Sequence, residues 1–547
     1  MSRLLRIQLI LSISGSAVVA ALIAGLAYSS GLQTVPDVGG AYVEGVVGQP
    51  RLFNPLLASS TDYPAQTVDS LVFSGLVKED ASGAPQPDLA TSWDVSKGGR
   101  TYTFHLRKDV HWHDGQPFTA DDVLYTIGAI QSSDFSGDPD LAAAWRDVVI
   151  NKLDDVTVIV TLPEPFAPIL EYATVGILPA HLLAHTPPAE LAASSFNHQP
   201  IGTGPYRVLH SDLGAVVLEA FGGYYAPKPF ISRLMFRYYK DEHAVAQAVL
   251  NGDVEGDWHV GAADAPKLHS DGRLAFFQAV QPSFSGIAFN LQDPILSQKQ
   301  VRQAVAYAID RETLRARILN GMARVADSPI PPNSWAHDPN VFHYVYDPAR
   351  ARASLQAAGW QQDDQGVWTK DGQPLAPVML TDDAAGHVAL ANAVAGQLQQ
   401  FGIKATVQAV PFDGLVKDFL APRRFQMALL DWDVSGGDPD PYPLWHSSQA
   451  AAEGLNFSGW KNETADGLLE AGRKTAGTAA RREAYFRFQS VFLDDLPAFL
   501  LFHPVYEYAV DSSVHGVTLP SVVHPWDRFA TVSHWYIKTK RVSPLYR

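Results

Sequence analysis

Two hydrophobic periodicities alternate along this chain, and together they restrict it to a mixed α/β fold. Tyr102, Phe104 and Leu106 alternate with polar neighbours, which is the period-two pattern of a strand with one buried face. The run 301–309 has apolar residues at i, i+3, i+4, i+7 and i+8, which is typical of a helix with one buried stripe. Helices are also predicted at 345–359 and 385–401, and strands at 403–410 and 424–432, so we expect α/β lobes.

The length of the chain requires more than one such lobe. It has 547 residues, of which 46% are hydrophobic, and a single core stops growing at about 250–300 residues. No internal repeat interrupts the sequence. We therefore predict at least two lobes.

The N-terminus indicates export. Arg3 and Arg6 precede the uncharged run 7–36, whose most apolar part is 9–27, the pattern of a secretory signal or a signal anchor. The basic end stays in the cytoplasm, so everything after the run is exported. Residues 25–27 provide a small-residue cleavage site, whereas about 20 apolar residues also suffice to span a bilayer. Both outcomes stay open. We interpret residues 34–40 as a linker that leads to a first strand near Ala41.

Charge and cysteine content exclude several classes of function. The 57 acidic and 41 basic residues give a net charge of −16, which disfavours nucleic acid as a partner. The chain has no cysteine, so disulfides, thiol nucleophiles, thiolate zinc sites and a lipid-modified N-terminal cysteine are excluded.

Catalytic motifs are also missing from the sequence. The nucleophile-elbow, zinc-protease and phosphate-loop patterns do not occur. Paired acids such as Asp121 and Asp122 point in different directions and are interpreted as caps and turns. The sequence thus predicts a non-enzymatic protein without a cofactor or a resident metal.

Several blocks of sequence carry a family resemblance. Residues 87–127 read PDLATSWDVSKGGRTYTFHLRKDVHWHDGQPFTADDVLYTI, and residues 200–206 read PIGTGPY. Further blocks follow in order at 53–56, 290 with 301–314, 346–360 and 425–441. Over residues 41–530 the chain resembles the family 5 solute-binding proteins, the peptide and nickel class of ABC importers.

The resemblance implies a two-lobed periplasmic-binding-protein type II fold that closes about a hinge around its ligand. Lobe one would comprise residues 41–280, with an extra subdomain at about 88–196, and lobe two residues 281–505. Residues 506–547 would return to lobe one, and residues 1–40 would hold the signal or anchor and the linker. The implied function is extracytoplasmic binding of a peptide or peptide-like solute by a monomer, which delivers it to ABC permease subunits.

The same resemblance places a ligand-facing loop at 431–440, with Trp432, Asp433, Ser435 and Asp438. In peptide-binding relatives an acid three residues after the tryptophan receives the α-amine of the ligand. Ser435 occupies that position here. Asp433 or Asp438 is expected to substitute, because a buried ammonium needs an opposite charge.

Two further segments are candidates for the cleft. The stretch 59–63, with Thr61, Asp62 and Tyr63, corresponds to a ligand-facing loop of lobe one, although an ordinary turn with a helix cap fits it equally well. Phe284, with Ser285 beside it, is expected near the hinge.

Other interpretations stay open. His111 and His113 are two apart beside Asp114, and His446 follows the 431–440 loop, so a bound metal or a nickel chelate is an alternative ligand. Surface histidines are the plainer interpretation of the first pair. The glycine-rich turn 202–204 resembles a phosphate loop only weakly, because Pro205 removes a backbone donor. A membrane-tethered peptide sensor without transport is a further alternative.

Overall fold

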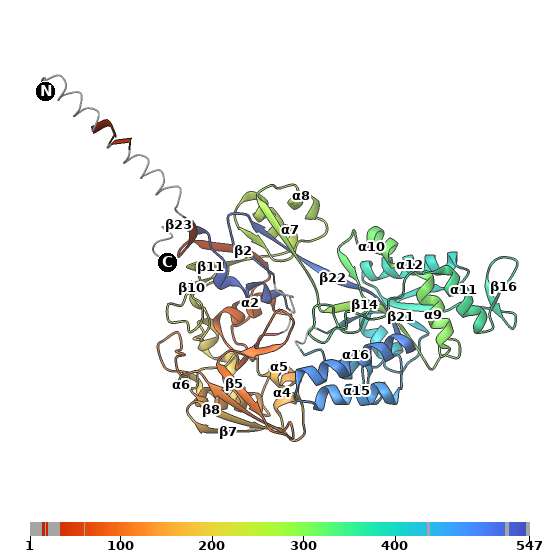
Figure 1. Ribbon diagram of the computed structural model, residues 1–547, viewed down its shortest axis with the longest axis horizontal. Coiled ribbons are helices and arrows are strands. Elements are labelled where there is room, and N and C mark those ends of the chain that lie inside the picture. The colour runs from red at the N-terminus through yellow and green to blue at the C-terminus, as the bar shows by residue number, and fades with distance from the viewer. Residues whose placement is uncertain are drawn as a thin grey trace.

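The computed structural model describes residues 14–16, 18–19, 33–59, 61–434, 438–519 and 524–542. Two lobes lie side by side along the long axis and are joined by a narrow waist (Figure 1). This confirms the predicted two-lobed α/β fold. Most of the predicted signal or anchor falls outside the described residues. In the described part, no helix has both the length and the apolar character needed to cross a bilayer.

One twelve-stranded sheet runs through both lobes. Its order is β20-β19-β21-β14-β22-β12-β2-β11-β10-β9, and β13 and β15 also pair with β22. The strands of lobe one are β2 (Ala41–Val47), β9 (Tyr206–Ser211), β10 (Ala215–Ala220), β11 (Arg233–Tyr239), β12 (Gly256–Asp257) and β13 (Leu274–Val280). Those of lobe two are β14 (Ser283–Phe289), β15 (Ala323–Val325), β19 (Val378–Asp382), β20 (Thr406–Val410) and β21 (Met427–Asp433).

The chain crosses the waist twice. The first crossing joins β13 to β14 through Gln281 and Pro282. The second is β22 (Ala498–Asp511), which pairs with β14 and β15 up to Pro504 and with β13 and β12 from Val505 onward. The backbone N–H of Gln281 donates to the carbonyl of Pro504 at 2.9 Å, so the two crossings are hydrogen-bonded to each other.

Lobe one carries a second, four-stranded sheet in the order β5-β6-β8-β7. Tyr102, Phe104 and Leu106 of β6 are buried, and their neighbours are half-buried, as the alternation predicts. The elements here are β3 (Val77–Glu79), β4 (Pro85–Pro87), β5 (Ala90–Val95), β6 (Thr101–Leu106), β7 (Val149–Asp154), β8 (Thr157–Thr161), α3 (Ala120–Ile130), α4 (Pro139–Trp145), α5 (Ile169–Tyr172), α6 (Ala180–Leu183), η1 (Pro188–Ala193) and η2 (Ser195–His198). The helices that flank the main sheet of this lobe are α2 (Tyr63–Val72), α7 (Glu242–Asn251), α8 (Ala265–His269), η5 (Pro525–Phe529) and η6 (Val532–His534).

In lobe two, helices cover both faces of the sheet. Ile287, Phe289, Met427 and Leu429 belong to one hydrophobic core, and Phe284, Ala428 and Trp432 belong to the other. The helices are α9 (Lys299–Ala308), α10 (Arg311–Ile318), α11 (Pro348–Ala357), α12 (Ala385–Gln400), α13 (Phe412–Gly414), η3 (Leu415–Leu420), α14 (Tyr442–Trp445), η4 (Ser447–Ala450), α15 (Glu463–Lys474) and α16 (Thr478–Asp495). A small sheet of β16 (Gln361–Gln362), β17 (Trp368–Lys370) and β18 (Gln373–Pro374) completes the lobe.

Local sequence signals set several of these boundaries. Thr119 and Asp122 form a capping box at the start of α3. Asp310 caps α10 by accepting a hydrogen bond from the Thr313 N–H. Gly359 and Gly402 follow α11 and α12 with positive φ, a conformation that glycine adopts without strain at the end of a helix.

The interpretation of residues 34–40 as a linker is wrong for most of the segment. Residues Gln33–Asp37 form strand β1, which pairs antiparallel with β23 (Lys538–Val542). Lys540 and Asp37 form an ion pair at 2.9 Å across this ribbon. The two ends of the described domain are thus held together. The sequence could not reveal this pairing, because the partner strand lies some 500 residues away.

The glycine-rich turn at 202–204 has a structural role. A Cβ on Gly202 would lie 1.8 Å from the carbonyl oxygen of Val72, at the end of α2. His113 fastens the turn: its Nδ1 accepts from the Gly202 N–H at 3.2 Å, and its Nε2 lies 3.0 Å from the Gly204 carbonyl oxygen. Burial lowers the pKa of His113 to about 4, so the ring is neutral at pH 7. Both ring nitrogens are engaged, which leaves none for a metal.

Candidate ligand-binding cleft

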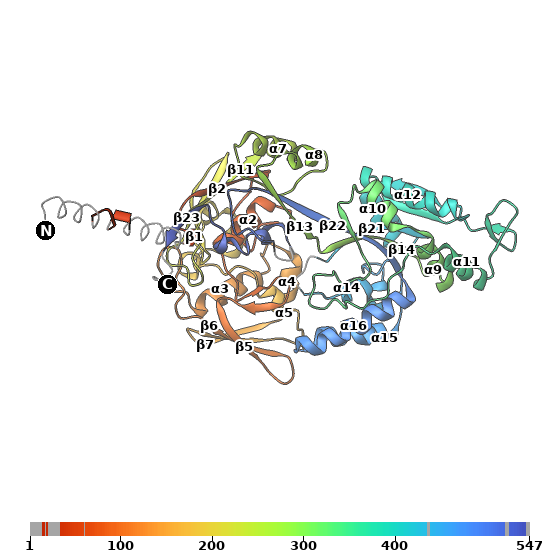
Figure 2. The same cartoon turned by 45° about the horizontal axis from the view of Figure 1, so that its top comes forward.

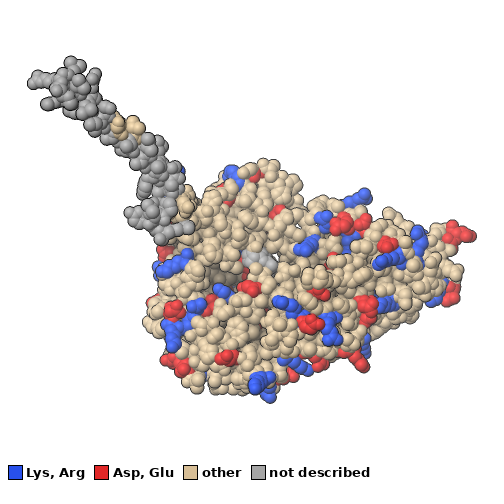
Figure 3. All heavy atoms as spheres, in the orientation of Figure 1, with Lys and Arg blue, Asp and Glu red and all other residues tan. Residues whose placement is uncertain are grey.

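The face drawn in Figure 3 is hollowed on the part of lobe one that lies toward lobe two, and side chains of both charges surround the recess. On the side of lobe two, β21 and β14 approach the waist together, with Asp433 opposite Ser283 and Asp431 opposite Ser285. The backbone of Val434, directly after β21, donates to the carbonyl of Pro282 at 2.9 Å. The end of β21 therefore lies at the hinge, where a moving lobe meets its ligand.

Alternation along β21 separates its aromatic and acidic side chains. Trp432 is buried with 5% exposure, whereas Asp431 and Asp433 are exposed. The Trp432 ring lies 5.4 Å from that of Phe284, which is fully buried. Gly286 makes room for this pair, because a Cβ there would lie 3.1 Å from the Trp432 ring. The structure places Trp432 and Phe284 in the core of lobe two, directly behind the edge of the cleft.

The acids of the 431–440 loop have different surroundings. Asp433 is exposed at the end of β21, and Ser435 lies outside the described residues. Asp438 is buried and accepts a hydrogen bond from Arg481 at 2.6 Å. Arg481 in turn donates to the carbonyl of Gly472 at 2.7 Å. Asp438 thus pairs with a cation of its own lobe.

The candidate segment of lobe one caps a helix. Asp62 is the N-cap of α2, and its carboxylate accepts from the backbone N–H groups of Ala65 and Arg51 at 3.2 and 3.1 Å. The Thr61 hydroxyl lies 3.0 Å from that of Ser59. Tyr63 is 39% exposed. Thr61 and Tyr63 are therefore the exposed side chains at positions 61–63.

Sequence reasoning missed the residue that packs against Tyr63. The ring of Trp258 lies 5.3 Å from the Tyr63 ring and 6.5 Å from that of Tyr506. Trp258 follows the two-residue strand β12, which is too short to give a periodic signal. The pair forms an aromatic surface on lobe one.

Sequence reasoning also missed a charged cluster next to Asp431. The Nδ1 of His387, in the first turn of α12, lies 2.7 Å from Asp382, and its Nε2 lies 3.0 Å from Asp431. Hydrogen bonding to Asp431 is the main reason that the pKa of His387 rises to about 9, so the ring is a cation at pH 7. Part of a signal existed, because Asp431 lies at the end of the strand predicted at 424–432, but no strand was predicted before Asp382.

The two lobes also touch on one side of the recess. Figures 1 and 2 both show α15 and α16 beside the α5 segment of lobe one. The Ala167 N–H donates to the carbonyl of Arg473 at 2.7 Å, and the Asp438 N–H donates to the Glu171 carboxylate at 3.3 Å. Arg473 also pairs with Asp440 at 2.7 Å. The loop that follows β21 is therefore part of the contact between the lobes.

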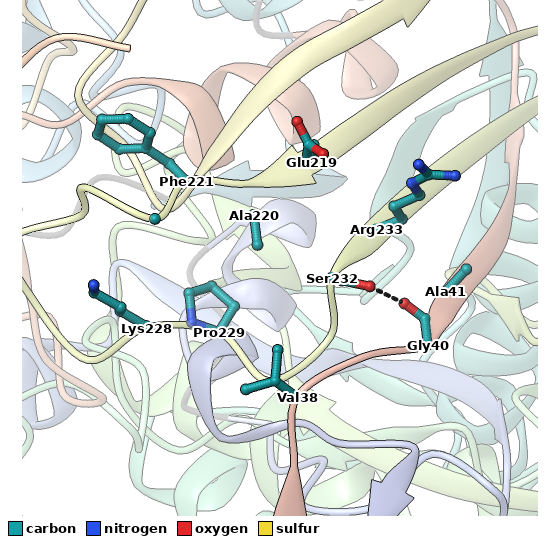
Figure 4. A pocket seen from close by; sticks show the side chains of 11 residues that line it. Val38, Gly40, Ala41, Glu219, Ala220, Phe221, Lys228, Pro229, Ser232 and Arg233 are labelled. Carbon is teal, nitrogen blue, oxygen red and sulfur yellow. Dashed lines mark hydrogen bonds between the residues drawn. The ribbon is translucent and has the colours of Figure 1, made fainter. Parts of the chain in front are cut away.

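A separate groove of about 540 Å³ lies away from this recess. Its lining residues come from the segments 38–41 and 219–233 (Figure 4). The Ser232 hydroxyl donates to the Gly40 carbonyl at 2.8 Å on its wall. No group of three or more metal-ligating side chains occurs within the described ranges.

Comparison with known proteins identifies the family. The family model described as "Bacterial extracellular solute-binding proteins, family 5 Middle" matches residues 84–454. The chain belongs to this family. It is 28% identical over 511 residues to the "Oligopeptide-binding protein AppA" of Bacillus subtilis, covering 92% of each chain.

Two solved structures with different ligands are similar to this chain. AppA from Bacillus subtilis, in complex with a nonapeptide, has a TM-score of 0.65 at 27% identity and is matched over 92% of this chain and 100% of its own. NikZ from Campylobacter jejuni, in complex with Ni(L-His), has a TM-score of 0.68 at 27% identity, with coverages of 91% and 99%. The peptide-bound and the nickel-bound structure have the same sequence identity to this chain, so overall similarity does not distinguish the two classes of ligand. The side chains of this cleft must distinguish them.

Proposed function

We propose that this solute-binding protein encloses a peptide or peptide-like solute between its lobes and delivers it to an ABC permease. The observation that carries the proposal is an exposed carboxylate, Asp433, at the end of β21 beside the hinge of lobe two, together with an exposed aromatic side chain, Tyr63, on lobe one. A peptide offers an ammonium to the first and apolar side chains to the second. The peptide-binding relatives support the same assignment.

Asp433 is the proposed acceptor of the ligand amine. Asp438, the other predicted acceptor, is buried against Arg481 at 2.6 Å, so an additional ligand cation there would compete with a guanidinium. Trp432 and Phe284 support the β21–β14 edge from inside the core. Thr61, Asp62 and Ser435 complete the proposed set of residues near the ligand.

The proposal includes the organisation of the chain. Lobe one comprises residues 41–280, with a subdomain at about 88–196, lobe two comprises residues 281–505, and residues 506–547 return to lobe one. The protein acts outside the cytoplasm as a monomer, is exported through its N-terminal segment, and is tethered to the membrane wherever that segment is retained. It carries out no bond chemistry.

A nickel–histidine chelate is the second candidate, because NikZ is as similar to this chain as AppA is. The cluster of Asp382, His387 and Asp431 offers it polar contacts at the strand ends.

A thermal-shift screen of the full chain distinguishes the two candidates. The probes are free-amine tri- to nonapeptides, the same peptides with acetylated N-termini, and Ni(L-His). A ligand that binds only the folded state stabilises it by about 2.7 kcal/mol at 100 times its Kd. We expect free-amine peptides to raise the Tm and Asp433→Asn to weaken them about tenfold or more, because a hydrogen bond to a charged group contributes about 1.5–3 kcal/mol.

Matched variants make the outcome decisive. Asp438→Asn is expected to lower the Tm of the ligand-free protein and to leave peptide affinity within about threefold once folding is allowed for. A response to Ni(L-His) alone would refute the peptide assignment. Equal affinity of free-amine and acetylated peptides would refute the role of Asp433.

A further inference from the structure

The contact between the lobes encloses an excess of acid. Lobe one contributes Glu79, at the end of β3, and Glu171, in α5; lobe two contributes Asp438 and Asp440. Ala84, in the β3–β4 turn, packs against Trp335 and Tyr485 of lobe two, and the Trp335 N–H donates to the Ser82 carbonyl at 3.0 Å. The hairpin and α5 are therefore covered by lobe two in this conformation.

The cations of this contact already have partners. Arg481 pairs with Asp438 at 2.6 Å and Arg473 with Asp440 at 2.7 Å, all within lobe two. Within the described part of the chain, neither Glu79 nor Glu171 forms an ion pair. Glu171 instead accepts the Asp438 N–H at 3.3 Å, so its carboxyl group lies next to a residue of its own charge.

The remaining groups that face the two glutamates add no positive charge. Asp80 on the same hairpin, Asp527 of η5 and Asp438 face Glu79. Asp438, Asp440 and Glu79 face Glu171. Tyr102 and Tyr172 border the contact from lobe one, and Tyr485 borders it from α16.

Both glutamates are half-buried, and their pKa values are raised mainly by this burial and secondarily by like charges nearby. Burial, together with Asp527, Asp438 and Asp80, raises the pKa of Glu79 from 4.5 to about 8. Burial and the nearby Asp438 also raise the pKa of Glu171 well above its usual range. When the lobes separate, lobe two no longer covers these groups, Asp438 moves away, and both pKa values fall toward the ordinary one.

We propose that closing the lobes takes up protons on Glu79 and Glu171, so that the closed form becomes more populated as the pH falls. The sign follows from linkage. A carboxyl group with a higher pKa in the closed form favours closure fully below the pKa of the open form, and this contribution is lost as the pH rises through the pKa of the closed form. For Glu79 the window therefore extends upward to about pH 8. The inference concerns the hinge alone and holds whichever ligand the cleft accepts.

The test measures lobe closure directly in the ligand-free full chain. The sequence contains no cysteine, so Leu153→Cys on lobe one and Glu453→Cys on lobe two, both exposed, give a clean pair of dye positions for single-molecule energy transfer. Between pH 8.5 and 5, the ratio of closed to open molecules should rise by up to about tenfold per pH unit for each carboxyl group that takes up a proton.

Substitutions then show whether Glu79 and Glu171 are the groups that take up the protons. Glu79→Gln with Glu171→Gln should remove the pH dependence and hold the ratio at its acidic value, while Glu79→Gln alone should reduce the slope. Glu164→Gln, an exposed carboxylate just before α5, should keep the wild-type slope. A wild-type ratio that does not change with pH, or a slope that survives the double substitution, would overturn the proposal. Either result leaves the peptide assignment untouched, because no ligand is present.

Discussion

Arg481 is the residue whose replacement should reveal most about the loop at the cleft. The substitution Arg481→Met keeps most of the side-chain volume and removes the charge. It leaves the Asp438 carboxylate, whose side chain is 8% exposed, without its partner at 2.6 Å. Loss of one member of a buried ion pair typically costs about 3–5 kcal/mol, because the other charge stays buried and unpaired.

Protonation of Asp438 sets an upper limit to this cost. The ordinary pKa of an aspartate is 3.8, so neutralising it at pH 7 requires about 4 kcal/mol, at 1.36 kcal/mol per pH unit. At pH 5 the same step requires only about 1.6 kcal/mol. In the variant, Asp438 has a raised folded-state pKa, so its destabilisation grows with pH above 3.8. The cost of the substitution should therefore shrink by more than half from pH 7 to pH 5.

Urea denaturation at pH 7 and pH 5 measures the loss of unfolding free energy that Arg481→Met causes. Arg487→Met, on an exposed position of the same helix, is the control and should change the free energy of unfolding by less than about 0.5 kcal/mol. Asp438→Asn added to Arg481→Met should restore most of the loss, because no charge is then buried. A loss below about 1 kcal/mol at pH 7, or an equal loss at both pH values, would refute the description of Asp438 as a buried, charge-dependent anchor.

Two further predictions concern the turn behind α2 and the protonation of its histidine. Gly202→Ala should destabilise the protein by about 2–4 kcal/mol in thermal melts, since its Cβ would lie 1.8 Å from a carbonyl oxygen. Gly128→Ala, at an exposed position in the last turn of α3 with nothing within 4 Å, should stabilise it by about 0.5–1 kcal/mol. If both changes had the same sign, the packing argument for the turn would fail. His113 is neutral when folded, so its contribution is present above pH 6.5 and is lost as the pH falls toward 4. The free energy of unfolding should drop by up to about 3 kcal/mol over that range, and urea titrations of His113→Gln should show a shallower acid dependence than wild type.

Local signals predicted much of the fold. The strand at Tyr102, Phe104 and Leu106 and the helix at 301–309 are where the sequence predicts them, and capping residues such as Thr119 and Asp310 mark helix starts. These features depend on hydrophobic spacing and on hydrogen bonds between near neighbours, which a sequence contains directly. The β1–β23 ribbon was missed, because nothing in the sequence of either strand indicates which distant segment it pairs with.

The candidate site was less accessible to such reasoning. The resemblance pointed to the 431–440 loop, but it did not distinguish Asp433 from Asp438 as the acceptor of the ligand amine. The structure separates them: Asp433 is exposed, and Asp438 is paired with a residue 43 positions away. Trp258 and His387 were missed because their partners come from other elements.

The sequence by itself determined the α/β composition, several helix boundaries and the family motifs, because each of these depends on the order of neighbouring residues. Only the tertiary structure decided which charges are neutralised and which are not. Asp438 has Arg481, and His387 lies between two aspartates, whereas the half-buried Glu79 and Glu171 form no ion pair among the described residues, and Glu171 meets the Asp438 N–H of the opposite lobe. Burial and ionic pairing sum contributions from every segment that packs nearby, and those segments are brought together only when the two lobes meet.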